Sequence, residues 1–407
     1  LLHTIAEIAP NLRKENHMSQ TDKYCTKTSY IRHNAAAAPG VKVCAIDIGY
    51  SGVKCYTDNC RACFPSMAIP SKEVEFAGEA NQTDILYRDE KGMWAVGSLA
   101  VKGMSIRDTN ESEKTLYSRN RYDSELFKII YRVGMALCLM EEPDIGSGGD
   151  RPIVLQTGLP PGYLKSDKRD ILRVLSGLHL FEIKVGNNEW KEIFFELKPE
   201  QVKVMAQPLG SLYSAAFDNN CRLIPGAKQY FTSSLLVLDP GFGTCDTYAV
   251  RNRTIDSSES FDNLGMRAVY KLLSDKIYQM YGEDIPVHAI PKILLAGEVA
   301  VLDKATICTT THPIREMLAE CSEEICRRAI QKIQSTYDYL REYRFLLITG
   351  GTGEAWMDRI RQHFSGIQGL TILKGNQNDA GLPQIFSNVR GYYFYQVGDQ
   401  RKQAMNK

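Results

Sequence analysis

The feature that most restricts the fold of this chain is a pair of similar strand ends, roughly 190 residues apart. "CAIDIGYSGVK" covers residues 44–54, and "LVLDPGFGTCD" covers residues 236–246. Each stretch is a short apolar strand followed by an aspartate, one further residue, a glycine and then a small polar residue. This repetition predicts two similar half-structures that face each other, each presenting one hairpin turn to a shared site.

The residues in these turns suit a polyphosphate. Glycine lets the backbone pass close to phosphate oxygens, so that amide N–H groups point inward as donors. Asp47 and Asp239 would repel a phosphate, so their presence implies a divalent cation, most simply Mg²⁺ with most of its waters retained. Lys54, at the far end of the first hairpin, is placed to bring a positive charge to the phosphates.

A third glycine-bearing strand end, "LLITGGTGEAW", completes the pattern. Gly350, Gly351 and Gly353 predict a flexible loop before a helix that starts near Glu354. A helix N-terminus attracts negative charge and offers free N–H groups, and a flat glycine loop suits an adenine ring or a ribose. The order of hairpin turn, connecting helix, second turn and glycine loop is far more specific than any one of these motifs.

Together these residues resemble the superfamily of actin, sugar-kinase and heat-shock-chaperone ATPases. "DIGYSGVK" is similar to its first phosphate loop, "DPGFGTCD" to its second and "TGGTGEAW" to its adenosine loop. Within the superfamily the chain most resembles ParM-like bacterial actins that segregate plasmids, through "TGLPPGYLKSDK", the hairpin "FEIKVGNNEWKEIFFEL" and "NVRGYYFY". The resemblance implies an α/β, actin-like (ribonuclease H-like, duplicated) two-domain fold, with mixed sheets and a nucleotide cleft between the lobes.

The resemblance also implies roles for individual residues. Asp47 and Asp239 would hold Mg²⁺ through water, and Gln207 would position the attacking water in a slow hydrolysis. The nucleotide-binding positions would be Gly49, Ser51, Gly52, Lys54, Gly241, Gly243, Thr244, Asp246, Gly350, Gly351, Thr352, Gly353 and Glu354. The resemblance implies ATP as the nucleotide. Tyr50 and Phe242 are bulkier than the residues usual in these loops, and this departure leaves GTP open.

The chain divides into four parts on this interpretation. We expect a loosely ordered polar extension over residues 1–40, a first domain over 41–206, a second domain over 207–375 and a C-terminal segment over 376–407 that returns to the first domain. Apolar periodicity predicts helices over residues 123–140, 263–281 and 313–343, and "KILLAGEVAV" predicts a strand.

The implied function is an actin-like ATPase that polymerises head-to-tail into nucleotide-dependent filaments. The ParM-like branch implies plasmid segregation through an adaptor protein bound to centromere-like DNA. The alternative is a small-metabolite or sugar kinase of the same superfamily, although no further acid after the second turn suggests a substrate pocket. A chaperone-like ATPase would need a large C-terminal domain, and only about 50 residues follow the glycine loop.

Composition narrows the remaining function classes. The net charge of +1 over 407 residues argues against a broad DNA-binding surface, so no direct DNA contact is expected. The absence of a long apolar run or a signal-like start predicts no membrane span and a cytoplasmic protein. Eleven scattered cysteines fit reduced thiols, and Cys60 and Cys63 lack the second pair that a zinc site needs, which favours ordinary packing.

Overall fold

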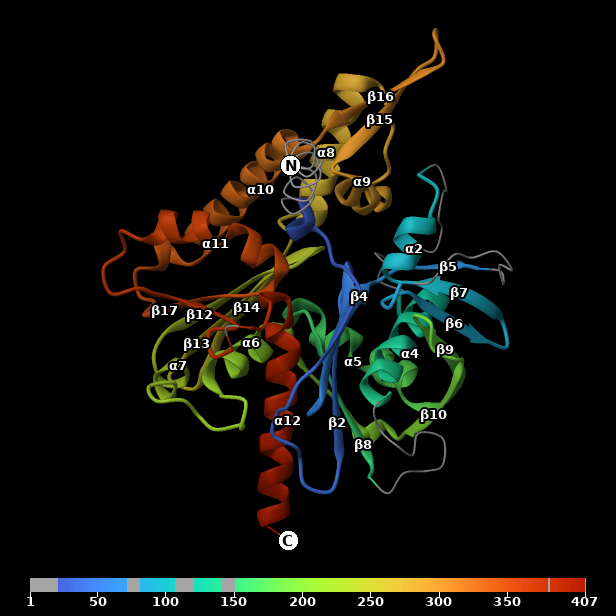
Figure 1. The fold of residues 1–407 in the computed structure, drawn as a ribbon. Helices are drawn as coiled ribbons and strands as arrows, with labels where there is room; N and C mark the ends of the chain where they lie inside the picture. Colours follow the sequence, from blue (N-terminus) through green and yellow to red (C-terminus); the bar gives the residue numbers. More distant parts are fainter. Residues whose placement is uncertain (1–20, 72–80, 107–120, 141–150, 380, 407) are drawn as a thin grey trace, which may run out of the picture.

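A computed structural model of the chain describes residues 21–71, 81–106, 121–140, 151–379 and 381–406 (Figure 1). Two sheets with the same internal strand order form its centre, and helices cover them. Each sheet has its own apolar core, so the chain builds two lobes.

The first large sheet has the strand order β1-β4-β3-β2-β8-β11. Its strands are β1 (Ser29–Arg32), β2 (Lys42–Ile48), β3 (Gly52–Tyr56), β4 (Cys60–Pro65), β8 (Ile153–Leu159) and β11 (Val202–Ala206). The strands β2, β3 and β4 form an antiparallel meander, whereas β8 and β11 run parallel to β2. Every residue of β2 is buried because helices pack on both faces of the sheet, as its continuous apolar run predicts.

The second large sheet has the order β14-β13-β12-β17-β18. Its strands are β12 (Leu235–Pro240), β13 (Thr244–Arg251), β14 (Thr254–Asp262), β17 (Phe345–Ile348) and β18 (Thr371–Lys374). It repeats the first sheet without β1: an antiparallel meander comes first, followed by two parallel strands. The expected duplicated architecture with mixed sheets is therefore confirmed.

Two helices meet where the lobes join. The helix α6 (Gln207–Ala216) packs along α12 (Ser387–Met405), and α12 also lies on β2 of the first sheet (Figure 1). A Cβ atom on Gly391 would lie only 1.6 Å from the carbonyl oxygen of Gly210, so the two backbones touch directly. On the other face of the first sheet lies α4 (Glu125–Leu139).

Four further helices of the described chain belong to the second lobe. They are α8 (Met266–Tyr281), α9 (Ile290–Ala296), α10 (Arg315–Thr336) and α11 (Gly350–Phe364). Gly282 and Gly297 end α8 and α9 in the left-handed conformation, with φ of 70° and 76°, which glycine adopts without steric cost. The remaining α-helices of the described chain are α2 (Ser98–Gly103), α5 (Leu164–Leu175) and α7 (Lys228–Thr232).

Two further sheets extend from the lobes. One has the order β10-β9-β6-β7-β5, from β5 (Ala68–Pro70), β6 (Ile85–Asp89), β7 (Gly92–Val96), β9 (Gly177–Val185) and β10 (Lys191–Leu197). The hairpin predicted from "FEIKVGNNEWKEIFFEL" is thus confirmed as β9 and β10. The other sheet is the hairpin of β15 (Glu298–Asp303) and β16 (Cys308–Pro313), which projects away from the body of the second lobe (Figure 1).

Three local predictions were wrong. The polar extension is not loosely ordered over residues 21–40, because this segment forms a short 3-10 turn (Asp22–Tyr24) and β1, which pairs with β4; residues 1–20 lie outside the described part. "KILLAGEVAV" is not one strand, because Gly297 separates the end of α9 from β15. The helix predicted over residues 313–343 ends earlier, at Thr336.

The remaining expectations on organisation have different outcomes. The helices predicted over residues 123–140 and 263–281 are confirmed as α4 and α8. No helix among the described residues combines the length and the apolar character that a membrane crossing requires. The division into four parts at residues 40, 206 and 375 stays a prediction.

Candidate functional site

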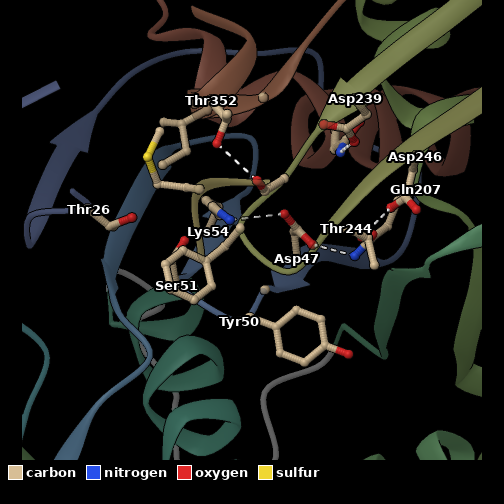
Figure 2. A pocket seen from close by; sticks show the side chains of 18 of the residues that line it. Thr26, Asp47, Tyr50, Ser51, Lys54, Gln207, Asp239, Thr244, Asp246 and Thr352 are labelled. Carbon is tan, nitrogen blue, oxygen red and sulfur yellow. Dashed lines mark hydrogen bonds and ion pairs between the residues drawn. The ribbon is translucent and has the colours of Figure 1, made fainter. Parts of the chain in front are cut away.

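The two predicted turns face each other across one cavity between the lobes. The β2–β3 turn contributes Gly49 and Ser51, and the β12–β13 turn contributes Gly241. Figure 2 shows Ser51 and Asp47 from the first lobe beside Asp239 and Thr244 from the second. The two turns are far apart in sequence, and they meet here because the two sheets place equivalent strand ends toward each other. The cavity has a volume of about 120 Å³.

Asp47 is the charged centre of the first turn. It is the penultimate residue of β2 and is only 5% exposed. The ammonium group of Lys54 lies 3.4 Å from one of its carboxylate oxygens, and the side-chain amide of Gln207 donates to the other at 3.2 Å (Figure 2). The first strand end and the start of α6 are therefore connected through Asp47.

Asp239 occupies the equivalent place in the second turn, where it pairs across β12 and β13 with Asp246. The amide of Asn388 donates to its carboxylate at 2.6 Å. Burial raises the pKa of Asp239 to about 6, Asn388 opposes this shift, and the nearby charge of Asp47 adds to it. The charge of Asp47 thus disfavours ionisation of Asp239, and a cation between the two carboxylates would relieve this effect.

Asp246 is the third buried acid. The hydroxyl of Thr244 donates to one of its oxygens at 3.1 Å, while the other oxygen is buried without a hydrogen-bond partner in the described part of the chain. Burial raises the pKa of Asp246 to about 7, opposed by Ser260 and reinforced by Asp239.

These carboxylates suit a cation that keeps its waters better than a cation bound directly by protein ligands alone. Among the described residues no three acids, histidines or cysteines lie close enough to hold a metal ion directly. Mg²⁺ usually retains several waters and takes one or two carboxylates together with phosphate oxygens. Asp47 and Asp239, on opposite sides of the cavity, are suited to that arrangement.

The third glycine segment starts α11 rather than preceding it. The helix begins at Gly350, four residues before the predicted start at Glu354. Gly350 has a φ of +78°, and a Cβ atom there would lie 2.6 Å from a carboxylate oxygen of Asp239. The hydroxyl of Thr352 donates to the carbonyl of Gly241 at 3.0 Å, which fixes the second turn against α11 (Figure 2).

The structure brings most of the predicted site residues together. Those that line the cavity are Asp47, Gly49, Ser51, Lys54, Gln207, Asp239, Gly241, Thr244, Asp246, Gly350, Gly351 and Thr352. Four predicted positions do not line it: Gly52, Gly243, Gly353 and Glu354. The side of Gly52 is covered by Thr26, Gly243 is covered by the Tyr50 ring, Gly353 packs near Ile348, and Glu354 is exposed.

Several cavity residues were missed by the sequence reasoning. Asn388 lies on α12, in the segment "NVRGYYFY" that carries part of the family resemblance, and no local pattern there distinguishes it from its polar neighbours Ser387 and Arg390. Arg121 lies against the ring of Tyr50, and their meeting depends on tertiary packing that no local pattern reveals. Residues 23–26 also line the cavity, although they belong to the segment expected to be loose.

Cys60 and Cys63 serve separate contacts. The thiol of Cys60 lies 3.3 Å from the hydroxyl of Thr57, and that of Cys63 lies 3.2 Å from the hydroxyl of Ser29. Both thiols are buried, and burial raises the pKa of each.

Comparison with known proteins gives one match to a family model and a shared fold. Residues 45–210 match the family model described as the N-terminal domain of actin-like proteins. No curated protein matches the chain.

Solved structures of similar fold cover most of the chain. A pCBH ParM non-polymerisable quadruple mutant is 21% identical with a TM-score of 0.65, and the match covers 88% of this chain and 99% of that one. A 15-stranded ParM filament from Clostridium botulinum is 20% identical with a TM-score of 0.62, covering 89% and 99%. An archaeal actin homologue in complex with ADP is 17% identical with a TM-score of 0.54, covering 90% and 100%.

Proposed function

We propose that this protein is an ATPase that assembles into filaments. The match of residues 45–210 to the model for the N-terminal domain of actin-like proteins and the actin-like fold of the described chain support this proposal. One observation carries the proposal: Asp47 and Asp239, from two equivalent turns, face the same cavity between the lobes. An archaeal protein of the same fold has been solved with ADP, which supports a nucleotide as the ligand.

The residues of the cavity fit Mg²⁺·ATP, with GTP as the other candidate. When bound, Mg²⁺ would neutralise charge on the phosphates, and Asp47 and Asp239 would hold it through water. Backbone amides of the two turns would donate to phosphate oxygens. The ammonium of Lys54 would move its interaction from Asp47 toward the phosphate chain.

Gln207 is placed to orient the attacking water. Its amide already contacts Asp47 at 3.2 Å, so it lies beside the carboxylate that would hold the cation. A neutral amide does not remove a proton, so turnover would depend on positioning and charge neutralisation and would be slow. We expect hydrolysis to follow assembly and to weaken the contact between subunits.

A head-to-tail contact requires two different faces on each subunit, and it gives an open filament when the rotation does not close a ring. The hairpin of β15 and β16 offers one candidate face. Its Ile307 is 82% exposed, and Leu302 on the same hairpin is 37% exposed. The solved ParM filament of the same fold supports self-assembly as the use of such a surface.

Light scattering of the purified full chain with Mg²⁺·ATP, together with phosphate release, tests this function. We expect a nucleotide-dependent rise at micromolar concentration, filaments by negative-stain microscopy, and loss of both signals in Asp47→Ala and Asp239→Ala. The exposed Asp358 allows a matched control, Asp358→Ala. Unchanged turnover and assembly in the two cavity variants would contradict the proposal, whereas activity on a panel of sugars would support the kinase alternative.

Plasmid segregation is the further step of the proposal. The likeness in fold to ParM supports it, and the net charge of +1 fits an adaptor protein that contacts the DNA in place of this chain. We therefore expect no shift of double-stranded DNA by the purified protein alone. Salt-sensitive direct binding would contradict the adaptor arrangement.

A further inference from the structure

Arg121 is a buried cation for which the described residues provide no carboxylate partner. It is only 4% exposed, and it lines the cavity beside the first turn. One guanidinium nitrogen donates to the carbonyl of Ile48 at a long 3.4 Å, and another is buried with no hydrogen-bond partner among the described residues. Within the described ranges, no carboxylate forms an ion pair with it.

Aromatic rings surround Arg121. Its guanidinium carbon lies 4.4 Å from the ring centre of Tyr50 and 5.1 Å from that of Tyr122. Such contacts orient a guanidinium, but they replace little of the hydration that it loses on burial. Buried charges in proteins are normally paired, so the free nitrogen calls for an anion at the cavity.

We propose that Arg121 binds the phosphate chain of the nucleotide as a second cation beside Lys54. The proposal rests on the nucleotide function above, and it adds a residue that precedes α4, outside the three glycine segments. Guanidinium groups suit phosphate because their N–H groups are arranged as a fork. The Tyr50 ring, which lies between Arg121 and Gly243 of the second turn, would keep that fork oriented.

Binding of ATP and of adenosine to Arg121→Gln tests this role. We expect ATP affinity to fall at least about tenfold, adenosine affinity to stay within about twofold, and Arg121→Lys to recover part of the loss. The exposed Arg361 gives a charge-matched control, Arg361→Gln, which should bind both ligands as the original chain does.

Two results would overturn the Arg121 proposal. One is an Arg121→Gln variant that binds ATP normally. The other is an equal loss of ATP and adenosine, which a structural role alone would produce; a lower melting temperature identifies that case. If the original chain binds no nucleotide, the proposed function itself fails, so the two failures are distinguishable.

A separate observation concerns residues 21–28, which we call the strap. At one end the hydroxyl of Thr21 donates to the carbonyl of Leu294 in α9 at 2.8 Å, and Tyr270 of α8 donates to the carbonyl of Tyr24 at 2.6 Å. At the other end the strap is bound to the first lobe. The backbone N–H of Thr28 donates to the hydroxyl of Ser98 at 2.8 Å, and the backbone N–H of Ser98 donates to the hydroxyl of Thr28 at 3.0 Å.

The middle of the strap forms part of the cavity wall. Residues 23–26 line the cavity (Figure 2). The side chain of Thr26 packs against Gly52 so closely that a Cβ atom on Gly52 would lie only 2.7 Å from it. The cavity volume of about 120 Å³ is smaller than the roughly 300–1,000 Å³ of ordinary ligand pockets. The strap therefore joins the two lobes across a cavity that is too small for a nucleoside triphosphate.

We infer that the strap must detach from one lobe before a nucleotide enters, so that it acts as an internal brake on nucleotide binding. This inference also rests on the proposed nucleotide function. It predicts that the chain binds nucleotide slowly, at a rate set by release of the contacts to Tyr270 and Ser98 rather than by diffusion.

Hydrogen exchange of the full chain provides the first test. We expect Mg²⁺·ATP to increase amide exchange over residues 21–32. Protection of these amides would overturn the inference, because it would mean that the strap closes over the nucleotide instead of leaving. Absence of any nucleotide effect elsewhere in the chain would instead count against the proposed function.

Association rates of a fluorescent ATP analogue provide the second test. Tyr270→Phe and Ser98→Ala each remove contacts of the strap, and we expect each to speed association about fivefold or more, because each lost hydrogen bond weakens the closed state. Tyr278 lies on the same helix as Tyr270 but is exposed, so Tyr278→Phe is the matched control. Equal rates in all four proteins would overturn the inference.

Discussion

Replacing Asp246 with asparagine should remove a pH-dependent cost of folding. The Asp246 carboxyl is buried, and only one of its two oxygens accepts a hydrogen bond from a described residue, the hydroxyl of Thr244 at 3.1 Å. Burial raises its pKa from 3.8 to about 7. Asparagine has the same shape and carries no charge, so it removes the ionisation and keeps an oxygen that Thr244 can reach.

The sign and the size follow from linkage. A raised carboxyl pKa means that the folded state prefers the protonated form. The contribution of Asp246 to stability is therefore complete below pH 3.8 and is lost as the pH rises through about 7. At about 1.4 kcal/mol per pKa unit, the free energy of unfolding should fall by about 2 kcal/mol between about pH 5.5 and about pH 8.5.

Urea unfolding at those two pH values, without nucleotide or divalent cation, measures this change. Between the two pH values, the free energy of unfolding should fall by about 2 kcal/mol less in Asp246→Asn than in the original chain. Asp358→Asn, an exposed control, should show the same fall as the original chain. The same pH dependence in Asp246→Asn and in the original chain would refute the reasoning.

Three further substitutions test the site and the assembly surface. Gly350→Ala puts a Cβ atom 2.6 Å from Asp239 at a φ of +78°, so we expect nucleotide affinity, measured by titration calorimetry, to fall at least about tenfold. Gln207→Ala should slow phosphate release about 100-fold with little change in nucleotide affinity, because the side chain would act on water. Ile307→Asp should raise the protein concentration needed for light scattering without changing nucleotide affinity, because it replaces an exposed apolar side chain.

Each of these predictions has a clear opposing result. Gly369 has a similar φ of +85° but open space around it, so Gly369→Ala is the control for backbone strain. If Gly369→Ala lost as much nucleotide affinity as Gly350→Ala, backbone strain and not contact with Asp239 would explain the loss. Unaltered phosphate release in Gln207→Ala would exclude its water-orienting role. Unaltered scattering in Ile307→Asp would place the filament contact elsewhere.

The paired turns could be predicted from sequence because their information is local. Each turn is an apolar strand, an aspartate and a glycine within a few residues, and the two strands β2 and β12 occupy equivalent places in the two sheets. Asp47 and Asp239 consequently lie at the same cavity, as the repetition suggested. The duplicated order of the sheets follows from the same repetition.

The strap and Arg121 could not be predicted in this way. The partners of Thr21 and Tyr24 are 273 and 246 residues away along the chain, and polar residues before the first strand carry no period that would indicate burial. Arg121 meets the Tyr50 ring through packing between distant segments. The error at "KILLAGEVAV" has a local cause, because a short apolar run fits a strand or a buried helix equally well.

The accessibility of the thiols has a practical consequence. Of the eleven cysteines, eight are buried, Cys25 and Cys221 are half-buried, and Cys308 is exposed. A maleimide dye added to the native protein should therefore react first at Cys308, next to Ile307 on the projecting hairpin. If the hairpin is the assembly face proposed above, a fluorophore at that position would report when one subunit meets the next, without any cysteine having to be engineered in or removed.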